Sequence, residues 1–163
     1  MKMSNNLTNS EILKLFSGLK TWKSGLEKAP HKPLLLLLAL GKCKNKGQRL
    51  LKYSEIEDEL KGLLICFGKY RKSIKSEQPF WRLTSDQLWE IPDKKLIHVN
   101  VSGDPSRREL IEKGIQGGFK EDIFKKLASD SNLFEQVVEI LLRENFQGIY
   151  HDDIRLATGL MAG

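Results

Sequence analysis

Stretches of apolar residues along the chain predict a mostly helical fold built around one buried helix. Residues 34–40 are apolar at all seven positions, so we expect the helix that contains them to be buried on every side. Pro33 fits the first turn of this helix, because a missing N–H costs nothing there. The apolar block is too short to span a bilayer, which requires about 20 residues. It therefore predicts the central helix of a globular core.

Helices are also predicted on both sides of this block by apolar residues at helical spacing. The first covers residues 12–19 and is preceded by a capping box in which Thr8 and Glu11 pair. Residues 41–49 are polar and lysine-rich and are predicted to form a loop, and residues 54–67 a third helix. The last third of the chain is predicted to be helical scaffold, with apolar faces at residues 123–127 and 133–142 and a short helix from His151.

A β-hairpin is predicted after the third helix. Aromatic and β-branched residues at positions 78–84 and 88–91 flank a short polar turn, which is typical of two paired strands. Gly117 and Gly118 are expected to break the chain. Three helices followed by a hairpin is the order of a winged helix, although many α+β domains begin in this way. We therefore predict a mainly α (α+β) fold, a single helical domain over residues 1–163 with a winged-helix-like N-terminal half and a small β-hairpin.

The charge of the chain is positive and unevenly distributed. The net charge is +6 and the isoelectric point is near 9.3. Residues 1–92 contain 17 Lys and Arg against 9 Asp and Glu, whereas residues 93–163 contain 10 against 12. A basic half of this kind favours a polyanionic partner such as nucleic acid. A soluble domain can reach the same net charge without such a partner, so charge alone leaves both interpretations open.

Three basic segments are candidate phosphate-binding sites. His31 and Lys32 stand at the start of the leucine-rich helix, where the helix dipole favours an anion. A second helix is predicted to begin at Asp104, as its N-cap, which places two arginines in its first turn. Cations are unfavourable there unless something compensates, and an external phosphate would do so. The two arginines of this second segment are Arg107 and Arg108. The third segment contributes Arg71, Lys72 and Lys75.

The segment at residues 78–82 adds an apolar surface with a polar edge. In a strand, Phe80 and Trp81 point to opposite faces, so we expect one of them in the core. Pro79 and the other aromatic residue are then expected to be exposed. An apolar patch among cations needs an explanation beyond phosphate binding.

The sequence offers little support for catalysis. The three histidines have no metal-ligand spacing, and no P-loop, dinucleotide-binding or nucleophile-elbow motif is present. Asp152 and Asp153 are better explained as acids at a helix start. We therefore predict a binding module that is not an enzyme and has no metal or cofactor. Cys43 and Cys66 are expected to be buried free thiols, which fits a reducing cytoplasm.

Four segments of the chain match a known family in the family's own order. They are residues 29–41, residues 79–83 with Leu88 and Trp89, residues 103–110 and residues 117–119. With these segments the chain resembles the sulfur-binding domain of bacterial phosphorothioate-dependent type IV HNH restriction endonucleases. The resemblance covers most of residues 28–146. It implies a domain that binds double-stranded DNA in which sulfur replaces a non-bridging phosphate oxygen in the Rp configuration.

The resemblance also implies which residues form the site. His31 and Lys32 are expected to contact the modified phosphate, and Pro79 and its neighbours to form an apolar wall against sulfur. Relatives often have an aromatic residue where Gln78 stands. An HNH nuclease module follows this domain in the family, and none is present here, so a nuclease is expected as a separate domain or partner. The implied DNA- and sulfur-binding residues are His31, Lys32, Gln78, Pro79, Phe80, Trp81, Arg82, Ser106, Arg107 and Arg108, with Arg71, Lys72 and Lys75 on the phosphate backbone.

Elementary chemistry agrees with such a site, and two alternatives stay open. Sulfur is larger and less strongly hydrated than oxygen, so apolar contact with sulfur and cationic donors on the remaining oxygen would favour the phosphorothioate. One alternative is a winged-helix module that reads bases through residues 54–67, although the acids at the start of that helix repel phosphate. The other is a protein-interaction domain whose basic half meets an acidic partner.

Overall fold

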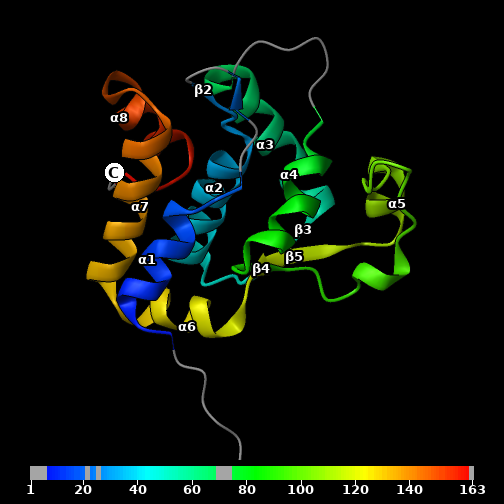
Figure 1. Cartoon of the computed structure of the whole chain (residues 1–163), viewed down its shortest axis with the longest axis horizontal. Coiled ribbons are helices and arrows are strands. Elements are labelled where there is room, and N and C mark those ends of the chain that lie inside the picture. Colours follow the sequence, from blue (N-terminus) through cyan, green and yellow to red (C-terminus); the bar gives the residue numbers. More distant parts are fainter. Residues whose placement is uncertain (1–6, 21–22, 25–26, 69–74, 162–163) are drawn as a thin grey trace, which may run out of the picture.

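The helix α2 (His31–Lys46) is the centre of the fold, as the apolar block at residues 34–40 predicts. All seven of these residues are at most 2% exposed. This computed structural model describes residues 7–20, 23–24, 27–68 and 75–161. Helices α1 (Asn9–Ser17) and α7 (Ser131–Asn145) lie on one side of α2, and α3 (Tyr53–Phe67) and α4 (Glu77–Arg82) lie on the other (Figure 1). Burial on both sides explains why this helix has no polar face.

The remaining helices form a shell around α2. The Thr8–Glu11 capping box that begins the first helix is confirmed. Within the described residues, no helix has the length and apolar character needed to cross a membrane. The helices are α1 (Asn9–Ser17), α3 (Tyr53–Phe67), α4 (Glu77–Arg82), α5 (Arg107–Glu112), α6 (Glu121–Ser129), α7 (Ser131–Asn145) and α8 (His151–Ala157), with 3₁₀ turns η1 (Leu83–Asp86), η2 (Lys94–Leu96) and η3 (Gly148–Tyr150).

A small antiparallel sheet closes one end of the helical body. Its strands β3 (Leu50–Lys52), β5 (Gln116–Phe119) and β4 (Trp89–Glu90) lie in the order β3-β5-β4. Two further short strands, β1 (Lys23–Ser24) and β2 (Glu27–Lys28), pair with each other. The predicted fold class, a mainly helical α+β domain, is confirmed, but the β-structure is a three-stranded sheet built from distant segments where a single hairpin was predicted.

Gly117 and Gly118 do not break the chain but lie in the central strand β5, so the prediction of a break is wrong. The strand needs glycine because a Cβ at Gly118 would lie 1.9 Å from the carbonyl oxygen of Arg49, the residue before β3. At Gly117 a Cβ would lie 2.9 Å from the ring of Phe80. Close packing therefore explains the two glycines.

The first strand of the predicted hairpin is also wrong, because residues 77–82 form the helix α4. This helix contacts both α2 and α3, so side chains on opposite sides of it are buried. Pro79 lies in the first turn, where proline is tolerated. In a segment of six residues with two adjacent buried aromatics, the apolar pattern does not show whether the segment is a strand or a helix.

The leucine-rich helix is longer than predicted and continues through the lysine-rich segment to Lys46. Lysines are favourable near a helix C-terminus, and Gly47 ends the helix with φ +59°. Cys43 is therefore buried within α2, as expected, whereas Cys66 is exposed, so the prediction that it is buried is wrong.

Candidate nucleic-acid interface

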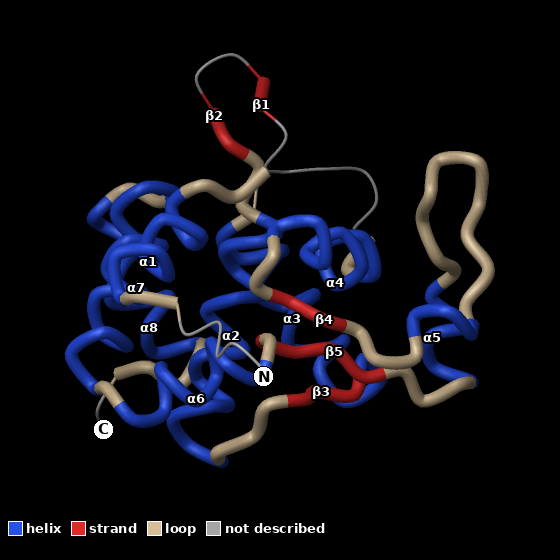
Figure 2. Tube along the Cα trace, turned by 60° about the horizontal axis from the view of Figure 1, so that its bottom comes forward, coloured by secondary structure: helices blue, strands red, loops and turns tan. Residues whose placement is uncertain are grey.

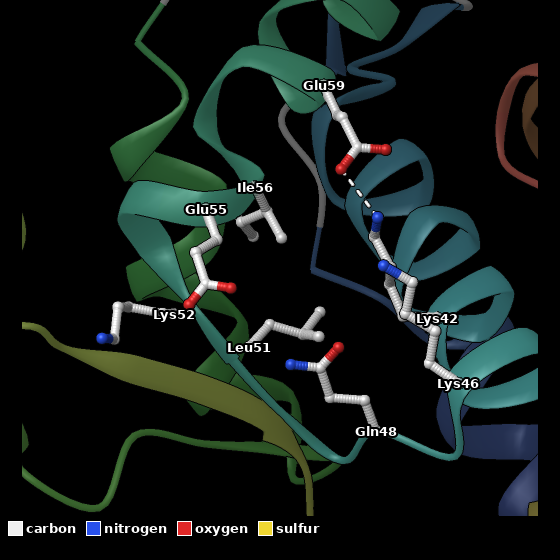
Figure 3. A pocket seen from close by; sticks show the side chains of 8 residues that line it. All are labelled: Lys42, Lys46, Gln48, Leu51, Lys52, Glu55, Ile56 and Glu59. Carbon is white, nitrogen blue, oxygen red and sulfur yellow. Dashed lines mark hydrogen bonds and ion pairs between the residues drawn. The ribbon is translucent and has the colours of Figure 1, made fainter.

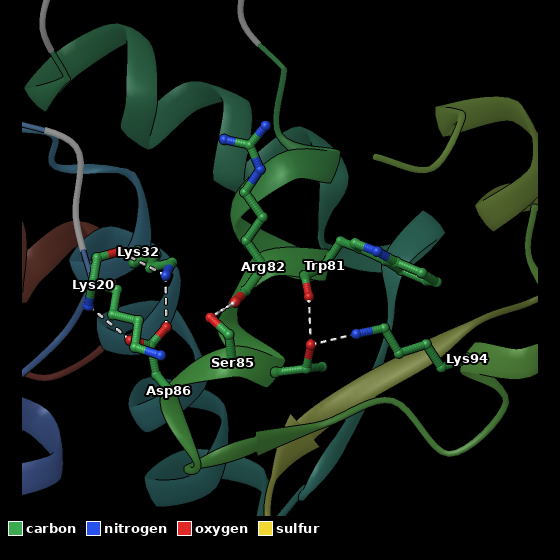
Figure 4. Close-up of polar contacts among 8 residues, drawn as sticks. Lys20, Lys32, Trp81, Arg82, Ser85, Asp86 and Lys94 are labelled. Atoms are coloured by element: carbon green, nitrogen blue, oxygen red, sulfur yellow. Dashed lines mark hydrogen bonds and ion pairs between the residues drawn. The ribbon is translucent and has the colours of Figure 1, made fainter. Parts of the chain in front are cut away.

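The ammonium group of Lys32 is held inside the protein at the start of α2. It donates hydrogen bonds to Oδ2 of Asp86, at 2.6 Å, and to the carbonyl oxygen of Lys20, at 2.7 Å (Figure 4). Oδ1 of Asp86 accepts a hydrogen bond from the N–H of Lys20 at 2.7 Å. Lys32 thus fixes the start of α2 against η1, and its direct contact with a phosphate stays a prediction. His31, the neighbouring residue, is half-buried.

The aromatic residues of α4 form a rigid base beneath the candidate interface. Phe80 is fully buried and packs edge-on against Tyr53 and Trp89, with ring centroids 5.2 and 6.0 Å away. Trp81 is 6% exposed, and the ammonium of Lys94 lies 4.8 Å from its ring centroid. Partial burial lowers the pKa of Lys94. The expectation that one of these aromatics is exposed together with Pro79 is wrong, because all three are buried.

Arg82 is clamped by a carboxylate from the loop before α5. Its Nε and Nη2 atoms donate to the two oxygens of Asp104 at 2.9 and 2.7 Å. The side chain of Asp104 is 8% exposed, whereas that of Arg82 is 50% exposed. Gln78 also donates to Asp104, at 3.3 Å. The buried carboxylate of Asp104 therefore orients both the exposed guanidinium of Arg82 and the amide of Gln78.

The prediction that Asp104 is the N-cap of α5 is wrong, and its pairing with Arg82 explains why. Its oxygens are occupied by Arg82, and Ser106 caps the helix by accepting a hydrogen bond from the N–H of Glu109 at 3.0 Å. Arg107 and Arg108 still lie in the first turn, as predicted.

A second buried acid clamps Arg107. The guanidinium donates from both Nε and Nη2 to Glu57 on α3, the latter at 2.9 Å. This hydrogen bond raises the pKa of Arg107. Burial raises the pKa of Glu57, but its contacts with Arg107 and Lys61 outweigh that effect, so that the carboxyl pKa lies below its ordinary value. Glu57 therefore supplies the compensation that a cation at this helix start requires.

The other predicted residues have less defined positions. Arg108 is almost fully exposed and pairs with Glu112 along the same helix. Ser106 and Lys75 are exposed. Arg71 and Lys72 lie outside the described residues. The structure thus joins α4 to the approach to α5 through Asp104, and α5 to α3 through Glu57, with the arginines at the surface.

Sequence reasoning missed the carboxylates that hold these cations. Glu57 lies 50 residues from Arg107, Asp86 lies 54 residues from Lys32, and Asp104 lies 22 residues from Arg82. No local pattern marks such pairs, since each depends on two elements that meet only in the folded chain. The unusual cations at the start of α5 were the one available signal that a partner was required.

A small pocket lies elsewhere on the molecule, between the end of α2 and the start of α3. Its volume is about 120 Å³, and Lys42 pairs with Glu59 across it at 2.7 Å (Figure 3). No predicted site residue lines it, so it is separate from the candidate interface. Among the described residues, no cluster of His, Cys, Asp and Glu has the arrangement of a metal site.

Solved structures with the same fold include two isolated domains and one larger enzyme. The sulfur binding domain of ScoMcrA complexed with phosphorothioated DNA matches with a TM-score of 0.72 and 22% identity, over 91% of this chain and 94% of that one. The corresponding domain of SprMcrA, also complexed with phosphorothioated DNA, matches with a TM-score of 0.76 and 21% identity, over 97% and 98%.

The larger enzyme is the type IV phosphorothioation-dependent restriction endonuclease ScoMcrA, with a TM-score of 0.75 and 22% identity. The match covers 91% of this chain but 32% of the endonuclease. No curated protein matches the chain. The sequence model of the family described as ScoMcrA-like, DNA sulfur-binding domain, matches residues 9–162. The chain therefore belongs to the family of ScoMcrA-like DNA sulfur-binding domains.

Proposed function

We propose that this chain binds double-stranded DNA carrying an Rp phosphorothioate and that it does so to direct a restriction nuclease to that DNA. The observation that carries the proposal is the family match over residues 9–162. The two related sulfur-binding domains described above were solved with phosphorothioated DNA.

The surface formed by α4, the loop before α5 and the first turn of α5 supplies the cations for DNA binding. Arg82 and Arg107 are each half-exposed and each held by a buried carboxylate. Planar guanidinium groups in fixed orientations suit phosphate oxygens. Arg108, Ser106 and Lys75 extend this surface with groups that can reach the backbone. These contacts are independent of sulfur and make binding depend on salt concentration.

Preference for sulfur requires an apolar contact beside these cations. We assign it to His31 and to the edge of α4 at Gln78 and Pro79. Because Pro79 is buried, the half-buried side chain of Gln78 supplies part of the accessible wall through its methylene groups. Sulfur accepts weaker hydrogen bonds than oxygen, so an apolar contact at this edge favours the phosphorothioate over the ordinary phosphate. The amide N–H of Gln78 is directed at Asp104, which leaves the methylene groups for the contact with sulfur.

The chain acts as a recognition domain, and the nuclease is supplied from outside residues 1–163. The ScoMcrA endonuclease has about three times the length that this chain matches. Such a module works where bacterial DNA is, in the cytoplasm. Reading of DNA bases by α3, as in a winged helix, is less compatible with the structure. The first two turns of α3 expose Glu55, Asp58 and Glu59, which repel phosphate.

The proposal is tested by comparing binding to three duplexes of one sequence: Rp-modified, Sp-modified and unmodified. We expect the Rp duplex to bind on the order of 10–100-fold more tightly, as for other discriminations of a single group. Fluorescence anisotropy at several salt concentrations measures this ratio. Equal affinity for the three duplexes would show that the chain does not read sulfur. His31→Ala should reduce the Rp preference, whereas Arg82→Ala should weaken all three complexes.

A further inference from the structure

The hydroxyl group of Tyr53, the first residue of α3, is buried. Helix α3 contacts both α4 and α5, and the three helices lie on the side of the molecule away from α7 (Figure 2). Burial raises the pKa of Tyr53, so the hydroxyl keeps its proton. A buried hydroxyl requires hydrogen-bond partners, and the identity of these partners shows what Tyr53 holds in place.

Two hydrogen bonds join this hydroxyl to an acid and to a serine. It lies 3.3 Å from Oε2 of Glu57 and 2.7 Å from Oγ of Ser76. A carboxylate can only accept, so the single proton of the tyrosine hydroxyl is donated to Glu57, and Ser76 is the donor in the shorter bond. Donation therefore runs from Ser76 to Tyr53 to Glu57. Arg107 donates to the same carboxylate.

Ser76 can make this contact because of the residues that follow it in α4. A serine directly before a helix normally caps it by accepting a hydrogen bond from the second or third N–H of the helix. The third residue of α4 is Pro79, which has no N–H, and the N–H of the second, Gln78, donates to the carbonyl oxygen of Lys75 at 3.2 Å. Among the described residues, the side chain of Ser76 makes no capping bond to α4. Ser76 is fully buried, so its hydroxyl depends on Tyr53 as an acceptor.

The position of α4 depends on such contacts because the helix is short. Its six residues form few internal hydrogen bonds, so contacts with the rest of the fold must hold it in place. Tyr53 supplies two of these contacts. Its hydroxyl binds Ser76 before the first turn, and its ring packs against Phe80 with centroids 5.2 Å apart. Gln78 and Pro79, the proposed sulfur-binding edge, lie between these two points of attachment.

We propose that Tyr53 is a positioning residue that joins the two parts of the DNA-binding site through its hydroxyl group. Through Ser76 it holds the sulfur-binding edge of α4, and through Glu57 it holds the carboxylate that orients Arg107 for phosphate. Loss of this one buried hydroxyl then affects the sulfur preference and the phosphate contacts together. The inference rests on the proposed function, because it takes the edge of α4 to face sulfur and Arg107 to face phosphate.

Tyr53→Phe removes the hydroxyl and keeps the ring. We expect its affinity for the unmodified duplex to fall about 3-fold, and the ratio of Rp to unmodified affinity to fall about 3–10-fold, each in the range of one buried hydrogen bond. Ser76→Ala removes only the hydrogen bond on the α4 side. It should lower the same ratio and leave the affinity for the unmodified duplex unchanged. Fluorescence anisotropy measures the affinities, and thermal unfolding shows whether each variant is folded at the assay temperature.

Thr158→Val is the matched control, because it also removes one buried hydroxyl and keeps the shape of the side chain. Thr158 is 4% exposed, and its hydroxyl donates to the carbonyl oxygen of Ile154 at 2.8 Å. It follows α8, which is no part of the proposed DNA-binding surface. This variant should bind both duplexes like the unchanged protein.

The inference is overturned if Tyr53→Phe leaves either the ratio or the affinity for unmodified DNA unchanged. It is also overturned if Thr158→Val lowers the ratio as much, because general loss of stability would then explain the effect. If Tyr53→Phe does not fold, Ser76→Ala decides, and an unchanged ratio in that variant overturns the inference. Failure of the proposed function has another signature, which is equal binding of modified and unmodified duplexes by the unchanged protein.

Discussion

Arg82 and Arg107 share an arrangement in which a buried carboxylate holds one edge of an exposed guanidinium. In each pair the acid is less than a tenth exposed and the arginine is half-exposed. An arginine fixed in this way loses little rotamer freedom when a phosphate binds. The acids near this surface are thus compatible with DNA binding, because each is paired with an arginine within the protein and holds that arginine in position.

Glu57→Gln tests whether Glu57 positions Arg107. The amide is similar in shape but carries no charge, so it holds the guanidinium less firmly. We expect binding of modified and unmodified duplexes to weaken together by about 3–10-fold, the effect of one charge-assisted hydrogen bond, with an unchanged sulfur preference. Glu55→Gln on the same helix is the control, because Glu55 is exposed.

The two variants separate positioning from the general electrostatic field. Both remove one negative charge, and on a simple field argument both should strengthen binding to DNA. Glu55→Gln should do so slightly, while Glu57→Gln does the opposite. If both variants strengthened binding, Glu57 would have no positioning role. Affinities measured at two salt concentrations by fluorescence anisotropy provide the comparison.

At the scale of elements, the strand β5 depends on glycine for its place between β3 and β4. A side chain at Gly118 would collide with the backbone carbonyl of Arg49, which leads into β3. Gly118→Ala should therefore lower the free energy of unfolding. We expect a loss of about 2–4 kcal/mol if β3 moves to make room, and a larger loss if it does not. Chemical denaturation followed by tryptophan fluorescence measures this change.

Gly62→Ala provides the control for that substitution. Gly62 lies in α3, and a Cβ there meets no other atom within 4 Å. Alanine at this exposed helical position should raise the free energy of unfolding by about 0.5–1 kcal/mol. An equal response of the two glycines would mean that contact with β3 does not decide the role of Gly118.

The elements also show what periodicity can and cannot predict. The central helix follows from an unbroken apolar block, and the first helix and α3 follow from apolar residues at helical spacing. The helix α4 does not, since contact with α2 and α3 buries Phe80 and Trp81 side by side and hides its period. The role of Gly118 was missed for a similar reason, because the backbone that approaches it lies far away in the sequence.

At the scale of the whole molecule, the candidate site is held by contacts between distant segments. Five basic residues were predicted from the sequence as site residues, and they lie on α2, α4 and α5: His31, Lys32, Arg82, Arg107 and Arg108. The acids that orient them could not be predicted, because a carboxylate on a helix reads as solvent-exposed until its partner is known. The local sequence thus indicates the basic residues of the site but not the acids that orient them.

The ion pair of Lys32 and Asp86 is the deepest of these contacts and supports the last prediction. The side chains are 10% and 1% exposed, so neither charge is well hydrated. Asp86→Asn leaves the buried ammonium without a counter-charge and should lower the free energy of unfolding by about 3–5 kcal/mol. The double variant Lys32→Met, Asp86→Leu removes both charges and should recover most of that loss, since an apolar pair of similar volume is often as stable. Urea denaturation of the three proteins measures both effects. If the single and double variants were equally unstable, the hydrogen bond that Asp86 accepts from the backbone N–H of Lys20 would matter more than its charge.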